Sequence, residues 1–147
     1  MHTHQTQVLA LTLIEGGIIE PINQNVLRYY GRVAYDNNYA GVAFDAGEGE
    51  RLADIMQDKS ILMMSNHGVL VGGASVARAY DDLYYLERTA AAQILAMSTG
   101  RPLKRIPQEI CEDTARQLTT DNMHRFANEH FKSLKRVLDR DQPDYRN

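Results

Sequence analysis

The chain has 147 residues, of which 44% are hydrophobic and 24% charged, a composition typical of one globular domain with a sizeable core. Its formal net charge of −3, without a basic block, gives no indication of nucleic-acid binding, which usually needs a basic face. A single cysteine, Cys111, excludes an intrachain disulfide, and no apolar run reaches the about 20 residues of a membrane span, so we expect a cytoplasmic protein that binds no membrane.

Two histidines in an H-x-H pattern, His2 and His4, come first along the chain. Alternate side chains of an extended strand point to the same face, so both imidazoles are expected on one side. Such a pair also occurs by chance as two solvated side chains. The next segment, residues 5–14, is apolar on nearly all sides, and its periodicity fits either a strand or a buried helix that ends near Gly16.

Several short elements are predicted in the middle of the chain. A short helix is expected over residues 22–30, and short strands over residues 33–35 and 41–44 on either side of a turn. Residues 47–57 are expected to form a helix that turns Glu48, Glu50 and Arg51 outward. Strands are expected over residues 60–65 and 69–71, and their connection is too short for a parallel crossover, so they should pair antiparallel.

A long helix is predicted from an N-cap at Ser75 to Ser98. Its apolar stripe has the following members: Val76, Ala79, Tyr80, Leu83, Tyr84, Ala90, Ala91, Ile94 and Leu95. The remaining positions, which should lie on other faces, include Arg78, Asp81, Asp82 and Gln93. Two further helices are expected over residues 107–118 and 121–139, where His124 and His130 are interpreted as solvated or packed residues, not ligands.

Glu87 lies on the apolar stripe of the long helix, between Tyr84 and Ala91. A buried carboxylate needs a partner or a raised pKa. One interpretation is structural, with Glu87 accepting hydrogen bonds from backbone amides or an arginine and locking the helix to the sheet. The other makes it the partner of a ligand histidine, since the rings that bind metals usually need such support.

A third histidine, His67, follows the apolar run of residues 61–64 and precedes Gly68. It therefore lies where a buried strand ends in a loop. If this strand and the H-x-H strand are neighbours, three imidazoles converge. Three histidines with an open fourth position are the ligand set of a catalytic zinc site.

The sequence N-H-G-V-L-V-G-G over residues 66–73 leads into the long helix that carries Glu87. With the preceding H-x-H, this order of motifs resembles the class II aldolase/adducin family, and the resemblance covers residues 2 to about 106. It implies that His2, His4 and His67 bind Zn²⁺ or another divalent metal. It also implies an α/β fold with a largely antiparallel central sheet flanked by helices, in which residues 1–106 form a partial domain and residues 107–147 a helical extension packed on it.

In this family the metal stabilises an enediolate while a carbon–carbon bond next to a ketone breaks, or assists epimerisation, in a small sugar or sugar phosphate. The resemblance further implies a homo-oligomer, commonly a tetramer. The H-x-H normally lies well inside such chains, so this chain is expected to correspond to the C-terminal portion of the domain. The part that holds the phosphate loops and the base would then be absent, and we expect little aldolase activity from the chain by itself.

No residue here stands out as the general base. Several tyrosines, including Tyr29, Tyr30 and Tyr145, could donate protons, but the chain has eight tyrosines, so no single one is singled out, and packing explains each of them. Two functions follow from these observations. The first is a zinc-dependent aldolase-like enzyme or the larger piece of one. The second is a non-catalytic adducin-like module that associates with other chains. The three histidines favour the first, because an association module does not need them.

Overall fold

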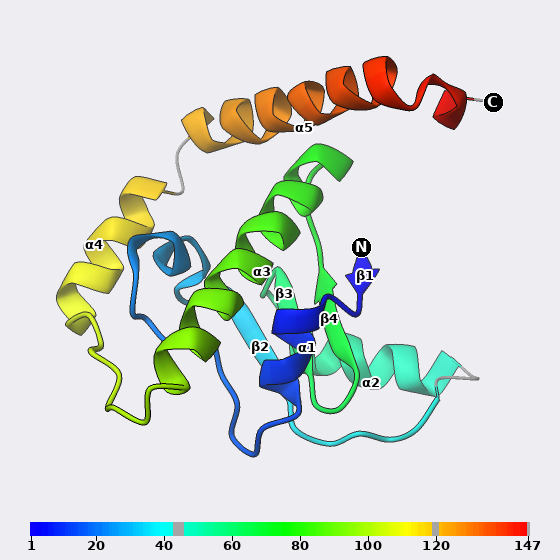
Figure 1. Cartoon of the computed structure of the whole chain (residues 1–147). Coiled ribbons are helices and arrows are strands. Elements are labelled where there is room, and N and C mark those ends of the chain that lie inside the picture. Colours follow the sequence, from blue (N-terminus) through cyan, green and yellow to red (C-terminus); the bar gives the residue numbers. More distant parts are fainter. Residues whose placement is uncertain (43–45, 119–120, 147) are drawn as a thin grey trace.

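The computed structural model describes residues 1–42, 46–118 and 121–146 and shows a mixed α/β fold around a four-stranded sheet (Figure 1). The strand order is β1-β4-β3-β2, with bounds β1 His2–Thr3, β2 Val33–Asp36, β3 Ile61–Met64 and β4 Gly68–Val71. The β1–β4 and β3–β4 pairs are antiparallel, whereas β2 and β3 are parallel. The predicted fold class, a largely antiparallel sheet flanked by helices, is confirmed.

The connections between the strands explain this mixture. Only residues 65–67 separate β3 from β4, and they form the turn of a hairpin that pairs Ile61 with Val71. Between β2 and β3 the chain is long enough to hold α2, Ala46–Met56, which packs against both strands. A parallel pair requires such a crossover, so α2 is the element that sets the direction of β2.

Two helices pack together over one face of the sheet. They are α1, Thr6–Thr12, and α3, Val76–Met97, and both contact β4 (Figure 1). The apolar segment after the H-x-H is thus a helix, which decides between the two predicted alternatives. The core between these layers consists mainly of the following side chains: Val8, Leu11, Ile61, Met63, Val69, Val71, Leu83 and Leu86.

The remaining elements surround the long helix. A 3₁₀ helix, η1, spans Gln24–Tyr29, α4 spans Gln108–Leu118, α5 spans Asp121–Asp141, and a second 3₁₀ turn, η2, spans Pro143–Arg146. Helix α4 packs against η1, and α5 packs against α3, beyond which it projects (Figure 1). Within the described residues, no helix has both the length and the apolar character needed to cross a membrane.

Two predictions about local structure require correction. Gly41 and Val42 are not in a strand, and residues 43 and 44 lie outside the described part of the chain. On α3, four polar residues predicted on the outer faces are buried, namely Arg78, Asp81, Asp82 and Gln93, whereas Val76 and Leu95 are exposed. The buried side chains have partners. Gln93 bonds the backbone of Ile18 and Glu20. Asp81 and Asp82 pair with arginines of η1 and the following turn, and Arg78 pairs with Asp82.

Candidate metal centre

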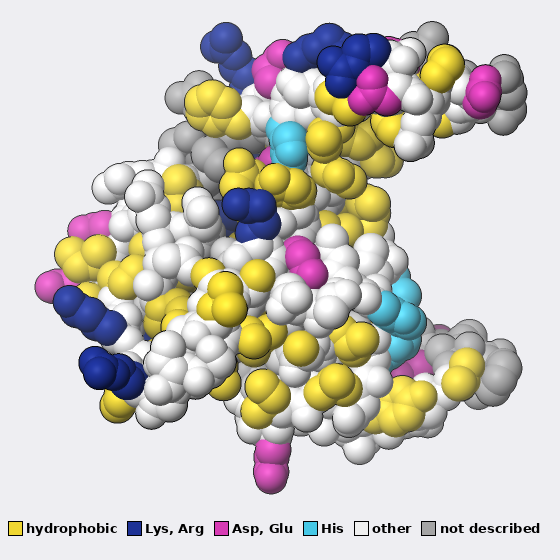
Figure 2. Space-filling view, in the orientation of Figure 1, with side chains coloured by type: hydrophobic (Ala, Val, Ile, Leu, Met, Phe, Trp, Pro, Cys, Tyr) yellow, Lys and Arg dark blue, Asp and Glu magenta, His cyan; other side chains and the backbone are white. Residues whose placement is uncertain are grey.

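The rings of His2, His4 and His67 meet at one edge of the sheet. Their centroids are 4.8 Å apart for His2 and His4, 4.8 Å for His2 and His67, and 5.1 Å for His4 and His67. One nitrogen from each ring can be chosen so that all three lie within 4.8 Å of one another. Figure 2 shows histidine side chains gathered on the surface here. The structure therefore brings together the three residues that the two motifs singled out.

The first two histidines are positioned by the pairing of β1 with β4. His2 lies opposite Leu70 and Thr3 opposite Val69, and the backbone of Met1 exchanges hydrogen bonds with Val71 at 2.7 Å in both directions. Because alternate residues share a face of a strand, His2 and His4 point the same way. The pairing thus delivers both rings to the end of β4, where His67 lies.

The turn that carries His67 depends on its two neighbours. Asn66 has φ 58°, in the left-handed region that asparagine tolerates better than most residues. Gly68 has φ 149°, and a Cβ at this position would lie 2.6 Å from the carbonyl oxygen of Thr3 and 2.8 Å from the ring of His4. Only glycine lets β1 approach this closely, so the glycine of the N-H-G motif is part of the site's construction.

The hydrogen bonds of His2 determine which of its nitrogens is available. Its Nδ1 lies 3.0 Å from the carbonyl oxygen of Val69 and must donate to it, because that oxygen only accepts. In the neutral ring, the lone pair is then on Nε2, which lies 3.1 Å from Nε2 of His4. Nitrogens about 2.0–2.1 Å from a tetrahedral zinc are about 3.3 Å apart, so this separation fits two ligands of one cation.

The environment of His67 favours the neutral, ligating form of its ring. Burial is the main cause that lowers the pKa of His67 from its ordinary value, and the neighbouring His2 and His4 lower it further. The carboxylate of Glu48 opposes them in part. The ring of Tyr39 also lies edge-on to His67, with centroids 6.3 Å apart. A neutral imidazole at neutral pH is the state that binds a metal ion.

Arg51 braces the strand end beside this turn. Its guanidinium donates to both carboxylate oxygens of Asp36, at 3.0 and 2.6 Å, and to both of Glu48, at 2.8 and 2.7 Å. The hydrogen bonds from Arg51 are the main cause that lowers the pKa of Asp36. Since the Asp36 carbonyl accepts from the amide of Ser65, this cluster ties α2 and β2 to the turn that holds His67.

Glu87 of α3 holds the start of α1, the helix that follows His4. Its carboxylate accepts hydrogen bonds from the backbone amides of Gln7, at 2.9 and 3.1 Å, and of Val8, at 3.0 Å. Among the described contacts it has no histidine partner. The structural interpretation is thus the one observed, although the amides belong to α1 and not to the sheet. Amides in the first turn of a helix have no backbone acceptor within that helix, and Gln5 at the N-cap of α1 supplies no side-chain acceptor, so the carboxylate of Glu87 fills this role.

We expect replacement of Glu87 by alanine to lower the free energy of unfolding by about 2 kcal/mol, because it leaves two amides without their charged acceptor. Glu87→Gln, which keeps one oxygen acceptor, should lose about half as much. Urea denaturation followed by circular dichroism measures both effects. In amide hydrogen exchange, Gln7 and Val8 should exchange faster in either variant.

The matched control is Glu50→Gln on the exposed face of α2, which removes a carboxylate without a hydrogen bond or ion pair among the described residues and should be neutral. Equal stability of Glu87→Ala and the parent chain, or unchanged exchange at Gln7 and Val8, would show that the carboxylate does not hold α1.

His130 takes no part in this cluster. His130 lies on α5, where its Nδ1 is 2.7 Å from a carboxylate oxygen of Asp81 and its ring contacts Tyr84 at 4.7 Å between centroids. It is a packed residue, as predicted. The side chain of His124 lies outside the described part of the structure.

Comparisons with known proteins match these motifs. The sequence model of the family described as Class II Aldolase and Adducin N-terminal domain matches residues 1–94. A protein of Caulobacter vibrioides, provisionally named an aldolase class 2 protein, is 32% identical over 145 residues. A 3-oxo-tetronate 4-phosphate decarboxylase of Pectobacterium atrosepticum is 32% identical over 94 residues, which are 61% of this chain and 42% of that protein.

Solved structures show the same fold. An aldolase II superfamily protein from Pseudomonas syringae superposes with a TM-score of 0.86 at 35% identity, covering 100% of this chain. The L-fuculose 1-phosphate aldolase of Glaciozyma antarctica superposes with a TM-score of 0.76 at 22% identity, covering 93% of this chain and 51% of its own, and is a likeness of fold alone. The match with the Caulobacter protein includes 99% of this chain but only 56% of that protein. The superposition on the Pseudomonas syringae structure likewise covers only 58% of that chain.

Proposed function

Because the chain belongs to the family of class II aldolases and adducin N-terminal domains, we propose that His2, His4 and His67 bind one divalent metal ion, with zinc as the first choice. We further propose that the site serves lyase-type chemistry, the cleavage of a carbon–carbon bond next to a carbonyl in a small sugar or sugar phosphate. The observation that carries the proposal is the convergence of three imidazoles, with a lone pair of His2 directed at His4.

The chain's own residues supply the ligands and their orientation. The Val69 carbonyl fixes the tautomer of His2, Glu87 secures the helix that follows His4, and Gly68 allows the close approach of the two segments. When bound, a divalent cation with an open position acts as a Lewis acid on a carbonyl or hydroxyl oxygen. His2 and His4 are exposed and His67 is half-buried, so a small substrate can reach this position from solvent.

The names of the relatives support this substrate class. One structural neighbour is an aldolase of L-fuculose 1-phosphate, and two relatives are decarboxylases of 3-oxo-tetronate 4-phosphate. Both names describe cleavage of a carbon–carbon bond in a phosphorylated sugar derivative. A single Lewis-acid site beside such a carbonyl would suit either reaction.

Metal content tests the first part of the proposal. Protein purified without an affinity tag should contain about one zinc ion per chain, or take up one when zinc is added, and X-ray absorption should show zinc–nitrogen distances of about 2.0–2.1 Å. No binding after addition of zinc would refute it. Manganese, cobalt and magnesium, added separately, establish which divalent metal binds best.

A turnover assay tests the second part. With zinc present, cleavage of L-fuculose 1-phosphate or decarboxylation of 3-oxo-tetronate 4-phosphate at a typical enzyme rate of about 1–1000 per second would establish a complete catalyst. Metal binding without turnover of either compound would limit this chain to the metal-binding portion of such a site.

Association with other chains is a second candidate function. It is favoured by exposed apolar side chains along α5, among them Phe126, Val137 and Leu138, and Figure 2 shows apolar surface on the underside of this helix. A relative from Schizosaccharomyces pombe is named an adducin-related protein and is 31% identical over 103 residues. We propose a homo-oligomer, with a tetramer as the expected state, and light scattering that finds a stable monomer would exclude it.

A further inference from the structure

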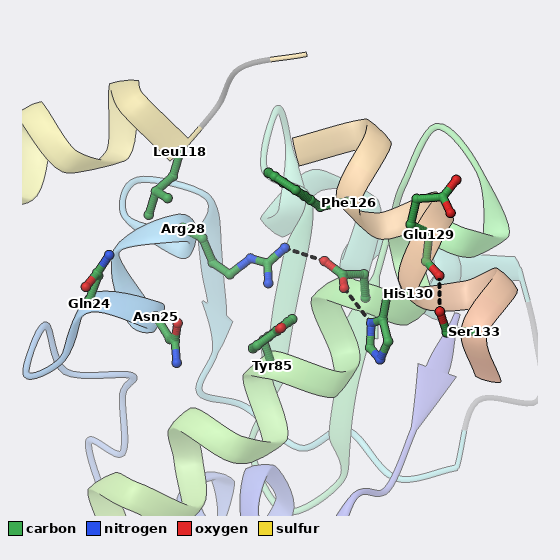
Figure 3. Close-up of a pocket in the computed structure, with 10 residues that line it drawn as sticks. Gln24, Asn25, Arg28, Tyr85, Leu118, Phe126, Glu129, His130 and Ser133 are labelled. Atoms are coloured by element: carbon green, nitrogen blue, oxygen red, sulfur yellow. Dashed lines mark hydrogen bonds and ion pairs between the residues drawn. The ribbon is translucent and has the colours of Figure 1, made fainter. Parts of the chain in front are cut away.

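A second pocket lies away from the histidine cluster, between η1, α3 and the two C-terminal helices (Figure 3). Its volume is about 450 Å³, within the range of small-molecule sites. It shares no residue with the three histidines, which lie on β1 and at the β3–β4 turn. Any ligand of this pocket is thus separate from a metal at the histidine site.

Arg28 forms the floor of this pocket. Its side chain is only 5% exposed, its Nη2 donates to Asp81 at 2.5 Å, and its Cζ lies 4.6 Å from the centroid of the Tyr85 ring. Figure 3 shows the guanidinium lying next to the ring of Tyr85. Within the described residues, neither Nη1 nor Nε makes a hydrogen bond, although Nε lies 3.5 Å from a carboxylate oxygen of Asp82. Nε is fully buried, so Nη1 is the donor of this guanidinium that an anionic ligand in the pocket can reach.

The charges around Arg28 are unequal. Arg28, Arg32 and Arg78 share only two carboxylates, those of Asp81 and Asp82. One positive charge among these groups therefore has no carboxylate of its own within the described part of the chain. Because arginine does not deprotonate in proteins, this charge persists at every physiological pH.

Neither of these two carboxylates is free to turn toward the pocket, and the third carboxylate of the lining, that of Glu129, pairs with Lys132 at 2.9 Å. Asp81, which lines it, uses one oxygen to bind Arg28 and the other to bind Nδ1 of His130. Asp82 is fully buried and faces the arginines. The unused donors of Arg28 are therefore the strongest polar feature that the floor offers to a ligand.

The walls of the pocket add two further properties. Phe126, which is 62% exposed, and Leu118 form an apolar side, while the amide side chains of Gln24 and Asn25 lie at the rim (Figure 3). We propose that this pocket binds a small organic anion, with its carboxylate or phosphate on Arg28 and its apolar part against Phe126 and Leu118. Carboxylates and phosphate esters share this chemistry, and the choice of probes separates them.

The test is a nuclear magnetic resonance titration of the full chain with benzoate, phenyl phosphate and the neutral analogue benzamide. Benzoate or phenyl phosphate should produce saturable shifts of the Arg28 Nε–H resonance and of backbone amides in η1. Benzamide should bind at least about tenfold more weakly, because it lacks the charge that pairs with the guanidinium. The anion with the higher affinity identifies the preferred acid group.

Arg28 itself is a poor target, because its loss would disturb the buried ion pairs. Asn25→Asp instead adds a negative charge at the exposed rim, and it should weaken anion binding about fivefold. Asn128→Asp adds the same charge on α5 outside the pocket lining and should change affinity less than about twofold.

Three results would overturn the proposal: shifts in η1 that do not saturate, equal affinity for benzamide, or equal weakening by the two aspartate variants. Shifts confined to His2, His4 and His67 would likewise refute it, since the anions would then occupy the candidate metal centre.

Discussion

Replacement of His67 by alanine is expected to lower the affinity for zinc by more than about 100-fold. Loss of an outer partner of a metal ligand already costs about 10- to 100-fold, and His67 is proposed as one of only three protein ligands. Competition with a chromophoric chelator at neutral pH measures the change. His2→Ala and His4→Ala should behave similarly, because each leaves two imidazoles at the same site.

The matched control is His130→Gln, which removes a histidine outside the cluster and keeps a hydrogen-bond donor for Asp81. Its zinc affinity should equal that of the parent chain. Thermal unfolding gives an independent measurement, because zinc at about 100 times its dissociation constant stabilises the folded chain by about 2.7 kcal/mol. Zinc-induced stabilisation that persists in His67→Ala would show that the ion binds elsewhere.

Replacement of Asp82 by asparagine is expected to lower the free energy of unfolding by about 3–5 kcal/mol, the usual cost of removing one partner from a buried ion pair. Asp82 is 0% exposed, and its carboxylate lies 3.0 Å from Arg32, 3.3 Å from Arg78 and 3.5 Å from Arg28. The shape of the side chain is kept, but Arg32 and Arg78 lose the carboxylate with which they pair among the described residues, and Arg28 keeps only that of Asp81. Urea denaturation followed by circular dichroism measures the loss.

The control for this variant is Asp54→Asn on the exposed face of α2, expected to be within about 0.5 kcal/mol of the parent chain. If Asp82→Asn does not fold in buffer, the protecting osmolyte trimethylamine N-oxide should restore its helical signal at concentrations that the parent chain does not need. A loss as small as that of the control would mean that the arginines do not depend on this carboxylate.

The elements of the fold could be read from local patterns, whereas the order of the strands could not. A three-residue turn between two apolar runs is enough to predict that β3 and β4 form a hairpin. The parallel pairing of β2 with β3 depends on where α2 packs, and no local pattern encodes that. For residues 5–14 the apolar side chains fitted two periods equally well, so only the structure distinguishes helix from strand.

The histidine cluster could be predicted because its residues stand next to strands and turns that local signals reveal. The role of Glu87 could not be predicted in the same way, since its partners are amides about 80 positions earlier in the chain. Asp81 and Asp82 could not be assigned correctly. Counting apolar positions places charged residues on the outside of a helix, and only the arginines of η1 and its following turn make their burial possible.

The pairing of β1 with β4 also determines when the histidines meet. This strand has two residues, and its pairing with β4 joins positions that are 66 and 68 apart in the sequence, Thr3 with Val69 and His2 with Leu70, so closing that loop costs entropy before any local contact offsets it. Short elements with few partners open most readily in a native protein. The segment carrying His2 and His4 should thus be among the last to dock during folding and the first to detach. The β3–β4 hairpin would then position His67 before the other two histidines reach the site.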